Sequence, residues 1–196
     1  MKPALPPFFF IRLARAWRRP ALALGLLLAL AGAQAQGFDA RWGLRWGQTP
    51  AEVQAQVQGW QALPPDGELE QFAGRSRLFS HPGFVAQVMG FRQGRLVEVR
   101  SFSQLFAEDA QGREGKLAHF GVGLALQARY GEASQVHEVM LPAERHPAEG
   151  FYACLKDAGC GLWARSWKHA EAFVVLELKA GKAPGSGWLS LRALEP

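Results

Sequence analysis

The sequence predicts an α+β fold, an antiparallel meander sheet with one long and one short helix packed on one face. Residues 115–131 carry apolar side chains at helical spacing and end at Tyr130-Gly131, where a helix C-cap favours glycine. Most of the chain after residue 37 otherwise divides into strand-length runs rich in β-branched and aromatic residues. Gly- and Pro-containing turns separate these runs.

The first 35 residues have the composition of a signal peptide. A basic segment without acids is followed by the apolar run ALALGLLLALA at residues 21–31 and by small residues that end at Ala35. A membrane span needs about 20 apolar residues, so this run is too short to be one. We expect cleavage after Ala35 and a single α+β domain of residues 36–196 that is periplasmic or secreted. An uncleaved signal anchor is the alternative.

The charge of the whole chain comes from this leader. The chain has 22 Lys and Arg residues and 17 Asp and Glu residues, and five of the basic residues but no acid lie within residues 1–36. The mature chain therefore has 17 charges of each sign and no net charge. A neutral domain lacks the basic surface that nucleic-acid binding requires, so we expect no nucleic-acid partner.

The segment before the long helix contains one predicted strand and the short helix. Residues 38–46 alternate between apolar and polar side chains, which predicts a first strand with one buried face. Thr49, Pro50 and Glu52 then supply an N-cap, a proline at the first helical position and the acid of a capping box. The sequence therefore predicts that a helix starts at this point.

A turn, a strand and a hairpin are expected next. Residues 63–67, LPPDG, are typical of a turn, and residues 68–80 have strand length. Residues 84–99 alternate around Gln93-Gly94, a pair that favours a tight hairpin turn. The strands expected after the long helix are residues 135–141, 151–155, 160–169, 173–179 and 188–194, with Val174, Leu176 and Leu178 as one buried row.

The long helix has two apolar rows on nearly opposite sides. We expect the first row to face the sheet, and the second to be covered by another element or to bind a protein partner. The first row is Leu117, Phe120, Leu124 and Ala128. The second row is Val122, Leu126 and Tyr130.

The two cysteines, Cys154 and Cys160, are predicted to form a disulfide. Both follow the signal and would reach an oxidising compartment, where pairing is expected. Five residues separate them, between two predicted strands of a hairpin, and neither a C-x-x-C motif nor zinc-ligand spacing is present. We therefore interpret the pair as a structural link.

Trp163, Arg165 and Trp167 lie on one face of a predicted strand and have two interpretations. Two tryptophans around an arginine could stack a sugar ring or a peptide if they were exposed. Alternatively, the tryptophans belong to the core and the arginine reaches the edge. The opposite side of the strand carries Leu162, Ala164 and Ser166, which are too small to fill a core.

Two short runs resemble those of a group of exported bacterial proteins. WGQTPAEV at residues 46–53 resembles the W-G-x-[ST]-x-x-E-V opening of these small proteins, most of which have no known role. RYGE at residues 129–132 resembles their [KR]-Y-G-x-P landmark, with Ala133 in place of the proline. The first run is also similar to the G-M-T-x-x-[QE]-V segment of BamE-type outer-membrane assembly lipoproteins, which share an α+β build with β-lactamase-inhibitor-protein-like domains. The resemblance implies a fold but no functional residue, and this chain lacks the lipid-bearing cysteine of the lipoproteins.

No motif in the chain indicates catalysis, a metal site or a cofactor. The five histidines form neither H-x-x-x-H nor H-E-x-x-H, and residues 183–187, APGSG, are typical of a turn rather than of a nucleophile elbow. We therefore expect a non-enzymatic soluble periplasmic protein that works through contacts with an unidentified envelope protein. The alternatives are a binder of a small ligand or glycan that uses the aromatic strand face, and a hydrolase whose active site has no recognisable motif.

Overall fold

The computed structural model describes residues 38–78, 81, 83–140, 150–157 and 159–196. The predicted signal peptide and its cleavage site lie outside these residues. Gly37–Pro196 forms one compact unit.

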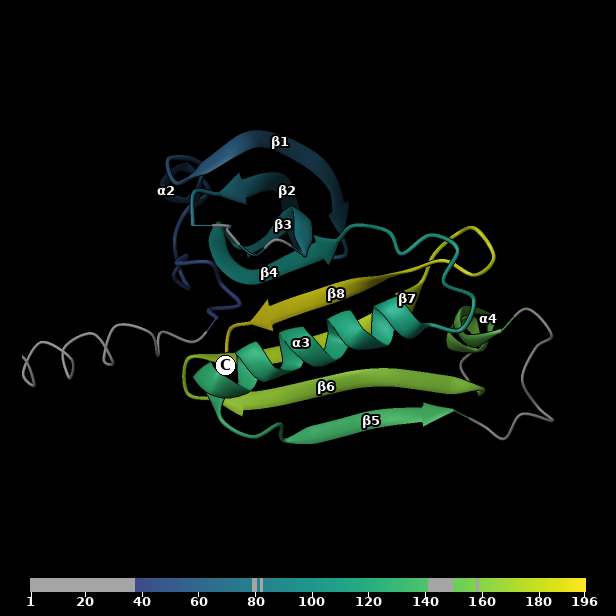
Figure 1. Cartoon of the computed structure of the whole chain (residues 1–196). Coiled ribbons are helices and arrows are strands. Elements are labelled where there is room, and N and C mark those ends of the chain that lie inside the picture. The colour runs from purple at the N-terminus through teal and green to yellow at the C-terminus, as the bar shows by residue number, and fades with distance from the viewer. Residues whose placement is uncertain (1–37, 79–80, 82, 141–149, 158) are drawn as a thin grey trace, which may run out of the picture. The chain divides into compact units, whose positions relative to one another are not determined.

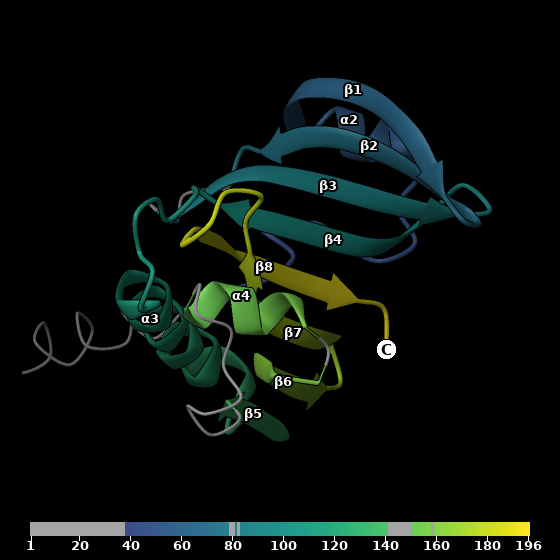
Figure 2. The same cartoon turned by 90° about the vertical axis from the view of Figure 1, so that its right-hand side faces the viewer.

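The predicted α+β fold is confirmed. Eight strands form one antiparallel sheet in the order β1-β2-β3-β4-β8-β7-β6-β5, so two four-stranded meanders meet where β4 pairs with β8. In Figure 2, strands β1, β2, β3, β4 and β8 follow one another from the top of the view. The first meander consists of β1 (Val57–Asp66), β2 (Leu69–Ser76), β3 (Phe84–Arg92) and β4 (Arg95–Ser103). The second consists of β5 (Gln135–Met140), β6 (Gly161–His169), β7 (Ala172–Ala180) and β8 (Gly187–Leu194).

Helices cover one face of this sheet. The described helices are α2 (Pro50–Gln54), α3 (Arg113–Tyr130) and α4 (Phe151–Lys156). Helix α3 contacts β6, β7 and β8 and lies along β7 (Figure 1), whereas α4 contacts β6 and β7. The predicted buried row of β7, Val174, Leu176 and Leu178, is confirmed and belongs to the core.

The predicted strand at residues 38–46 is wrong, because this segment is a series of turns. The carboxylate of Asp39 accepts hydrogen bonds from the backbone N–H groups of Arg41 at 3.0 Å and Gly43 at 3.3 Å, which favours a turn over a ladder. Trp42 and Leu44 are nevertheless buried. The alternation of apolar and polar residues therefore indicated which side chains are buried, but not a strand. The segment packs on the core of the first meander without pairing as a strand.

The start of α2 is confirmed in detail. Thr49 is the N-cap, Pro50 opens the helix, and Thr49 and Glu52 form the reciprocal capping box. The turn predicted at residues 63–67 is only partly correct, because β1 continues through the two prolines to Asp66. β1 is an edge strand, and both prolines lie in a register irregularity between Leu63 and Asp66, which is where a strand tolerates residues without an N–H group. The hairpin turn at Gln93-Gly94 is confirmed.

The two apolar rows of α3 are the reverse of the prediction. Val122, Leu126 and Tyr130 are buried against the sheet, whereas Leu117 is 72% exposed and Phe120 is 50% exposed. Glycines on the buried side allow the close approach of α3 to neighbouring side chains. A Cβ at Gly123 would lie 3.0 Å from a guanidinium nitrogen of Arg165, and one at Gly115 would lie 2.2 Å from the Tyr152 hydroxyl.

The disulfide between Cys154 and Cys160 is confirmed, but the strand predicted at residues 151–155 is wrong. The Cα atoms of the two cysteines are 5.0 Å apart. The segment is helix α4, so the bond joins a helix to the turn residue just before β6 instead of closing a hairpin. A five-residue apolar run cannot be assigned by periodicity alone. Phe151 and Tyr152, which are neighbours in sequence, are both buried, which a strand with one buried face does not allow.

The orientation of α3 predicts unequal costs for two leucine truncations. Leu126 is fully buried and Leu124 is 49% exposed. Leu126→Ala should lower the free energy of unfolding by about 3 kcal/mol, the usual cost of a core cavity. Leu124→Ala, the matched control, should cost less than about 1 kcal/mol. Urea unfolding of both variants measures this, and equal or reversed costs would contradict the orientation.

Candidate functional site

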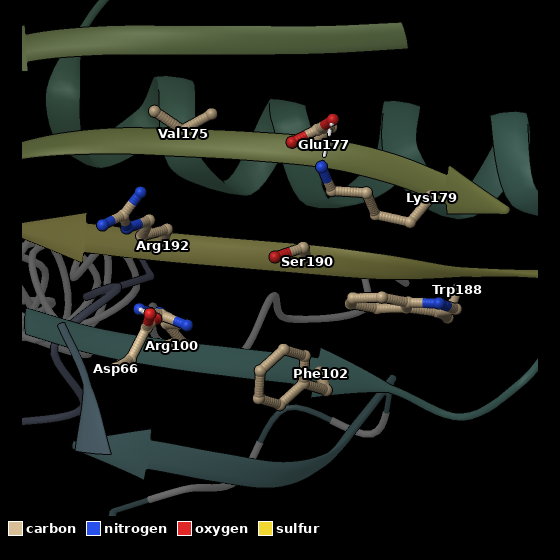
Figure 3. Close-up of a pocket in the computed structure, with 9 residues that line it drawn as sticks. All are labelled: Asp66, Arg100, Phe102, Val175, Glu177, Lys179, Trp188, Ser190 and Arg192. Carbon is tan, nitrogen blue, oxygen red and sulfur yellow. Dashed lines mark hydrogen bonds and ion pairs between the residues drawn. The ribbon is translucent and has the colours of Figure 1, made fainter. Parts of the chain in front are cut away.

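The face of the sheet opposite the core rows is partly exposed and hollowed. On β7, Val175, Glu177 and Lys179 alternate with the buried core row and are each partly exposed. Figure 3 shows this face with the teal helix α3 behind the sheet. A hollow of about 370 Å³ lies here.

The hollow is formed mainly by side chains of three neighbouring strands. Antiparallel register places Arg100 beside Arg192, and Phe102 beside Ser190. Lys179 is likewise placed beside Trp188. β4 contributes Arg100 and Phe102, and β8 contributes Trp188, Ser190 and Arg192. β7 contributes Val175, Glu177 and Lys179, and Asp66 reaches in from the end of β1.

One end of the hollow is charged and is organised by Glu98. The Glu98 side chain is only 1% exposed, and it accepts hydrogen bonds from Arg100 Nε at 2.5 Å and from Arg192 Nε. Arg100 also donates to Asp66 at 2.9 Å. The hydrogen bond to Glu98 raises the pKa of the Arg100 guanidinium above its ordinary value. Glu98 packs closely over Gly90, where a Cβ would lie 3.2 Å from Glu98 Cβ.

The other end of the hollow is aromatic. The ring centroids of Phe102 and Trp188 are 5.4 Å apart, with the planes tilted by 59°. Lys179 Nζ, beside them, forms an ion pair with Glu177 at 2.5 Å. The rings are partly exposed, so they offer apolar area next to paired charges. Such an arrangement suits binding by contact, because aromatic and arginine side chains contribute most of the energy at protein interfaces.

The predicted aromatic face does not line this hollow. Trp163, Arg165 and Trp167 lie on the side of β6 that faces α3. Trp167 is 1% exposed and its indole N–H donates to the Gly131 carbonyl at 3.1 Å. Trp163 is partly buried against the core and packs edge-on to Phe151 at 5.5 Å.

Arg165 belongs to a polar cluster beneath α3. Its guanidinium pairs with Glu138 at 2.6 Å, and His119 Nδ1 lies 3.7 Å from the same Glu138 oxygen. His119 is fully buried and neither ring nitrogen makes a hydrogen bond of normal geometry. Burial lowers the pKa of His119 to about 4; Glu138 and the Leu176 backbone oppose this effect, and Arg165 adds to it.

Tyr130 of the buried α3 row, and the runs at residues 46–53 and 129–132, contribute contacts that hold the fold together. Tyr130 donates to Asp39 at 3.1 Å, and burial raises its pKa to about 12. Trp46, from the first run, donates its indole N–H to the Glu171 carbonyl at 2.6 Å, and Arg129, from the second, contacts the Glu171 carboxylate at 2.7 Å. The two runs therefore meet at one residue, which links the segment before α2 to the end of α3.

Sequence reasoning did not identify the hollow. The signal available was the alternation within residues 173–179 and 188–194, whose less buried positions line it. That alternation does not reveal which strands are neighbours. Arg100 and Arg192 are 92 positions apart and become neighbours only through the β4–β8 register.

Comparisons with known proteins gave no match to a family model, a curated protein or a solved structure. Within the described ranges, no group of three or more His, Cys, Asp or Glu side chains is arranged to hold a metal ion. None of the described helices is both long and apolar enough to cross a membrane.

The buried His119 predicts an acid-dependent loss of stability. The folded pKa of about 4 lies below the ordinary value of 6.5, so the unfolded chain takes up the proton first as the pH falls. Stability is therefore lost between pH 6.5 and pH 4. From pH 7 to pH 5, the wild type should lose about 2 kcal/mol more unfolding free energy than His119→Leu. Urea unfolding at both pH values measures the difference, and parallel losses would contradict the assignment.

Proposed function

We propose that this protein is a non-enzymatic component of the bacterial cell envelope that binds a partner protein through the hollow between β4, β8 and β7. The observation that carries the proposal is the hollow itself, which joins a partly exposed aromatic pair to a fixed arginine cluster on adjacent strands. Side chains on paired strands are held more rigidly than side chains on loops, and prior order reduces the entropy lost on binding.

The proposed location is the periplasm, with the protein soluble after signal cleavage. The leader-like sequence of residues 1–35 supports export. The bond between Cys154 and Cys160 supports an oxidising compartment, because disulfides are rare in the cytosol. N-terminal sequencing of the exported protein should give a start near Gln36.

A glycan ligand is the second candidate. The face first considered for it, around Trp163, lies under α3, but the Phe102–Trp188 pair offers partly exposed rings beside Ser190. A sugar ring could stack there and hydrogen-bond to Ser190 and Glu177. The position of the charged cluster favours a protein, because a neutral sugar would use only the aromatic end.

In-cell photo-crosslinking tests the proposal. A photoreactive phenylalanine analogue placed at Trp188 should capture a specific envelope protein, identified by mass spectrometry, because this position lies in the hollow. The matched control is the same analogue at Leu124, which is exposed on α3 outside the hollow. Equal capture at both positions, or capture only at Leu124, would contradict the proposal. Absence of a protein adduct combined with glycan binding in vitro would favour the second candidate.

A further inference from the structure

We propose that the hollow recognises an extended segment of the partner that carries a carboxylate and, four positions away, an aromatic side chain. This inference rests on the proposed function and specifies the chemistry of the partner. The carboxylate binds at the Arg100–Arg192 end, and the aromatic ring packs at the Phe102–Trp188 end (Figure 3).

The charged end has an arginine that keeps free hydrogen-bond donors. Arg100 contacts two carboxylates, Glu98 and Asp66, whereas Arg192 contacts only Glu98, which it shares with Arg100. The Arg192 side chain is 45% exposed, and its two terminal nitrogens make no hydrogen bond to any described residue. A guanidinium with free terminal N–H groups and a fixed Nε is suited to bind an incoming carboxylate.

The aromatic end specifies the second group. Phe102 and Trp188 are both partly exposed and lie 5.4 Å apart, which is a separation at which a third ring can pack against either one. Lys179 lies beside Trp188 and forms an ion pair with Glu177, which no other cation of the hollow shares. The carboxylate is therefore directed to the opposite end of the hollow.

Strand geometry sets the spacing between the two groups. Trp188 and Arg192 are four positions apart on β8, which corresponds to about 13 Å along the strand. An extended partner segment has the same rise per residue and places positions i and i+4 on one side. Ser190 lies midway and is small, which leaves room for the partner's intermediate side chain. In a helical partner, the same 13 Å would require about nine residues.

Short peptides and the mature protein purified from the periplasm test this pattern by NMR titration. The probes are acetyl-GESTSWG-amide and its reverse-order form acetyl-GWSTSEG-amide. At least one should bind and shift the indole signal of Trp188 and the side-chain signal of Arg192. Replacing the glutamate of the peptide by glutamine should weaken binding about tenfold or more, because a charge-assisted hydrogen bond is lost. Shortening the spacing by one residue should weaken binding similarly.

Two matched protein variants test whether the glutamate of the peptide binds at Arg192. Arg192→Gln should weaken binding of the glutamate peptide about tenfold and barely affect the glutamine peptide, because the two changes remove the same contact. Arg95→Gln, an exposed arginine on the same sheet that does not line the hollow, should leave binding unchanged. Equal binding of the glutamate and glutamine peptides to the wild type would overturn the inference, as would equal effects of the two variants.

The outcomes also separate this inference from the proposed function. If Trp188 captures a protein in cells but none of the peptides binds, the acid and aromatic pattern is wrong and the proposed function stands. If the peptides bind as expected but no protein is captured at Trp188, the recognition chemistry is correct and the proposed role in the cell is wrong.

Discussion

The two faces of the sheet differ because apolar side chains of the helices and of segment 38–49 pack on only one of them. Segment 38–49, α2, α3 and α4 all contribute buried side chains to one core cluster. Neighbouring residues of a strand point to opposite faces, so β7 and β8 each supply a core row and an outer row that remains partly hydrated. On β7 and β8, the outer row lines the hollow. The position of the candidate site is therefore a consequence of where the core lies.

The charged end of the hollow depends on a buried acid. The Glu98 carboxylate is desolvated, and a buried carboxylate is stable only when it is paired, so both arginines are held at fixed places on their strands. Gly90, on the adjacent strand, has no side chain to compete for the space above it. The positions of both arginines are thus set by the register of β3, β4 and β8, so the proposed binding would need little reordering of their side chains.

The sequence was sufficient for the fold class and for features that depend on local chemistry. The capping box at Thr49 and the turn at Gln93-Gly94 are local, and both were predicted correctly. The orientation of α3 was predicted wrongly, because its two rows are similarly apolar. The contacts that distinguish the rows join residues far apart in sequence, such as Gly123 and Arg165. The hollow was missed for the same reason, since its rows are assembled by the pairing of β4 with β8.

A bulky side chain that fills the hollow tests most directly the claim that the hollow is a binding site. Ser190→Tyr would place a ring within the 370 Å³ hollow from the middle of β8, without touching the core row of the strand. We predict that the free energy of unfolding changes by less than about 1 kcal/mol, as expected for a surface position, while crosslinking to the partner through Trp188 is lost. A large loss of stability would show that the hollow belongs to the core. Unchanged stability with unchanged crosslinking would show that the partner binds elsewhere.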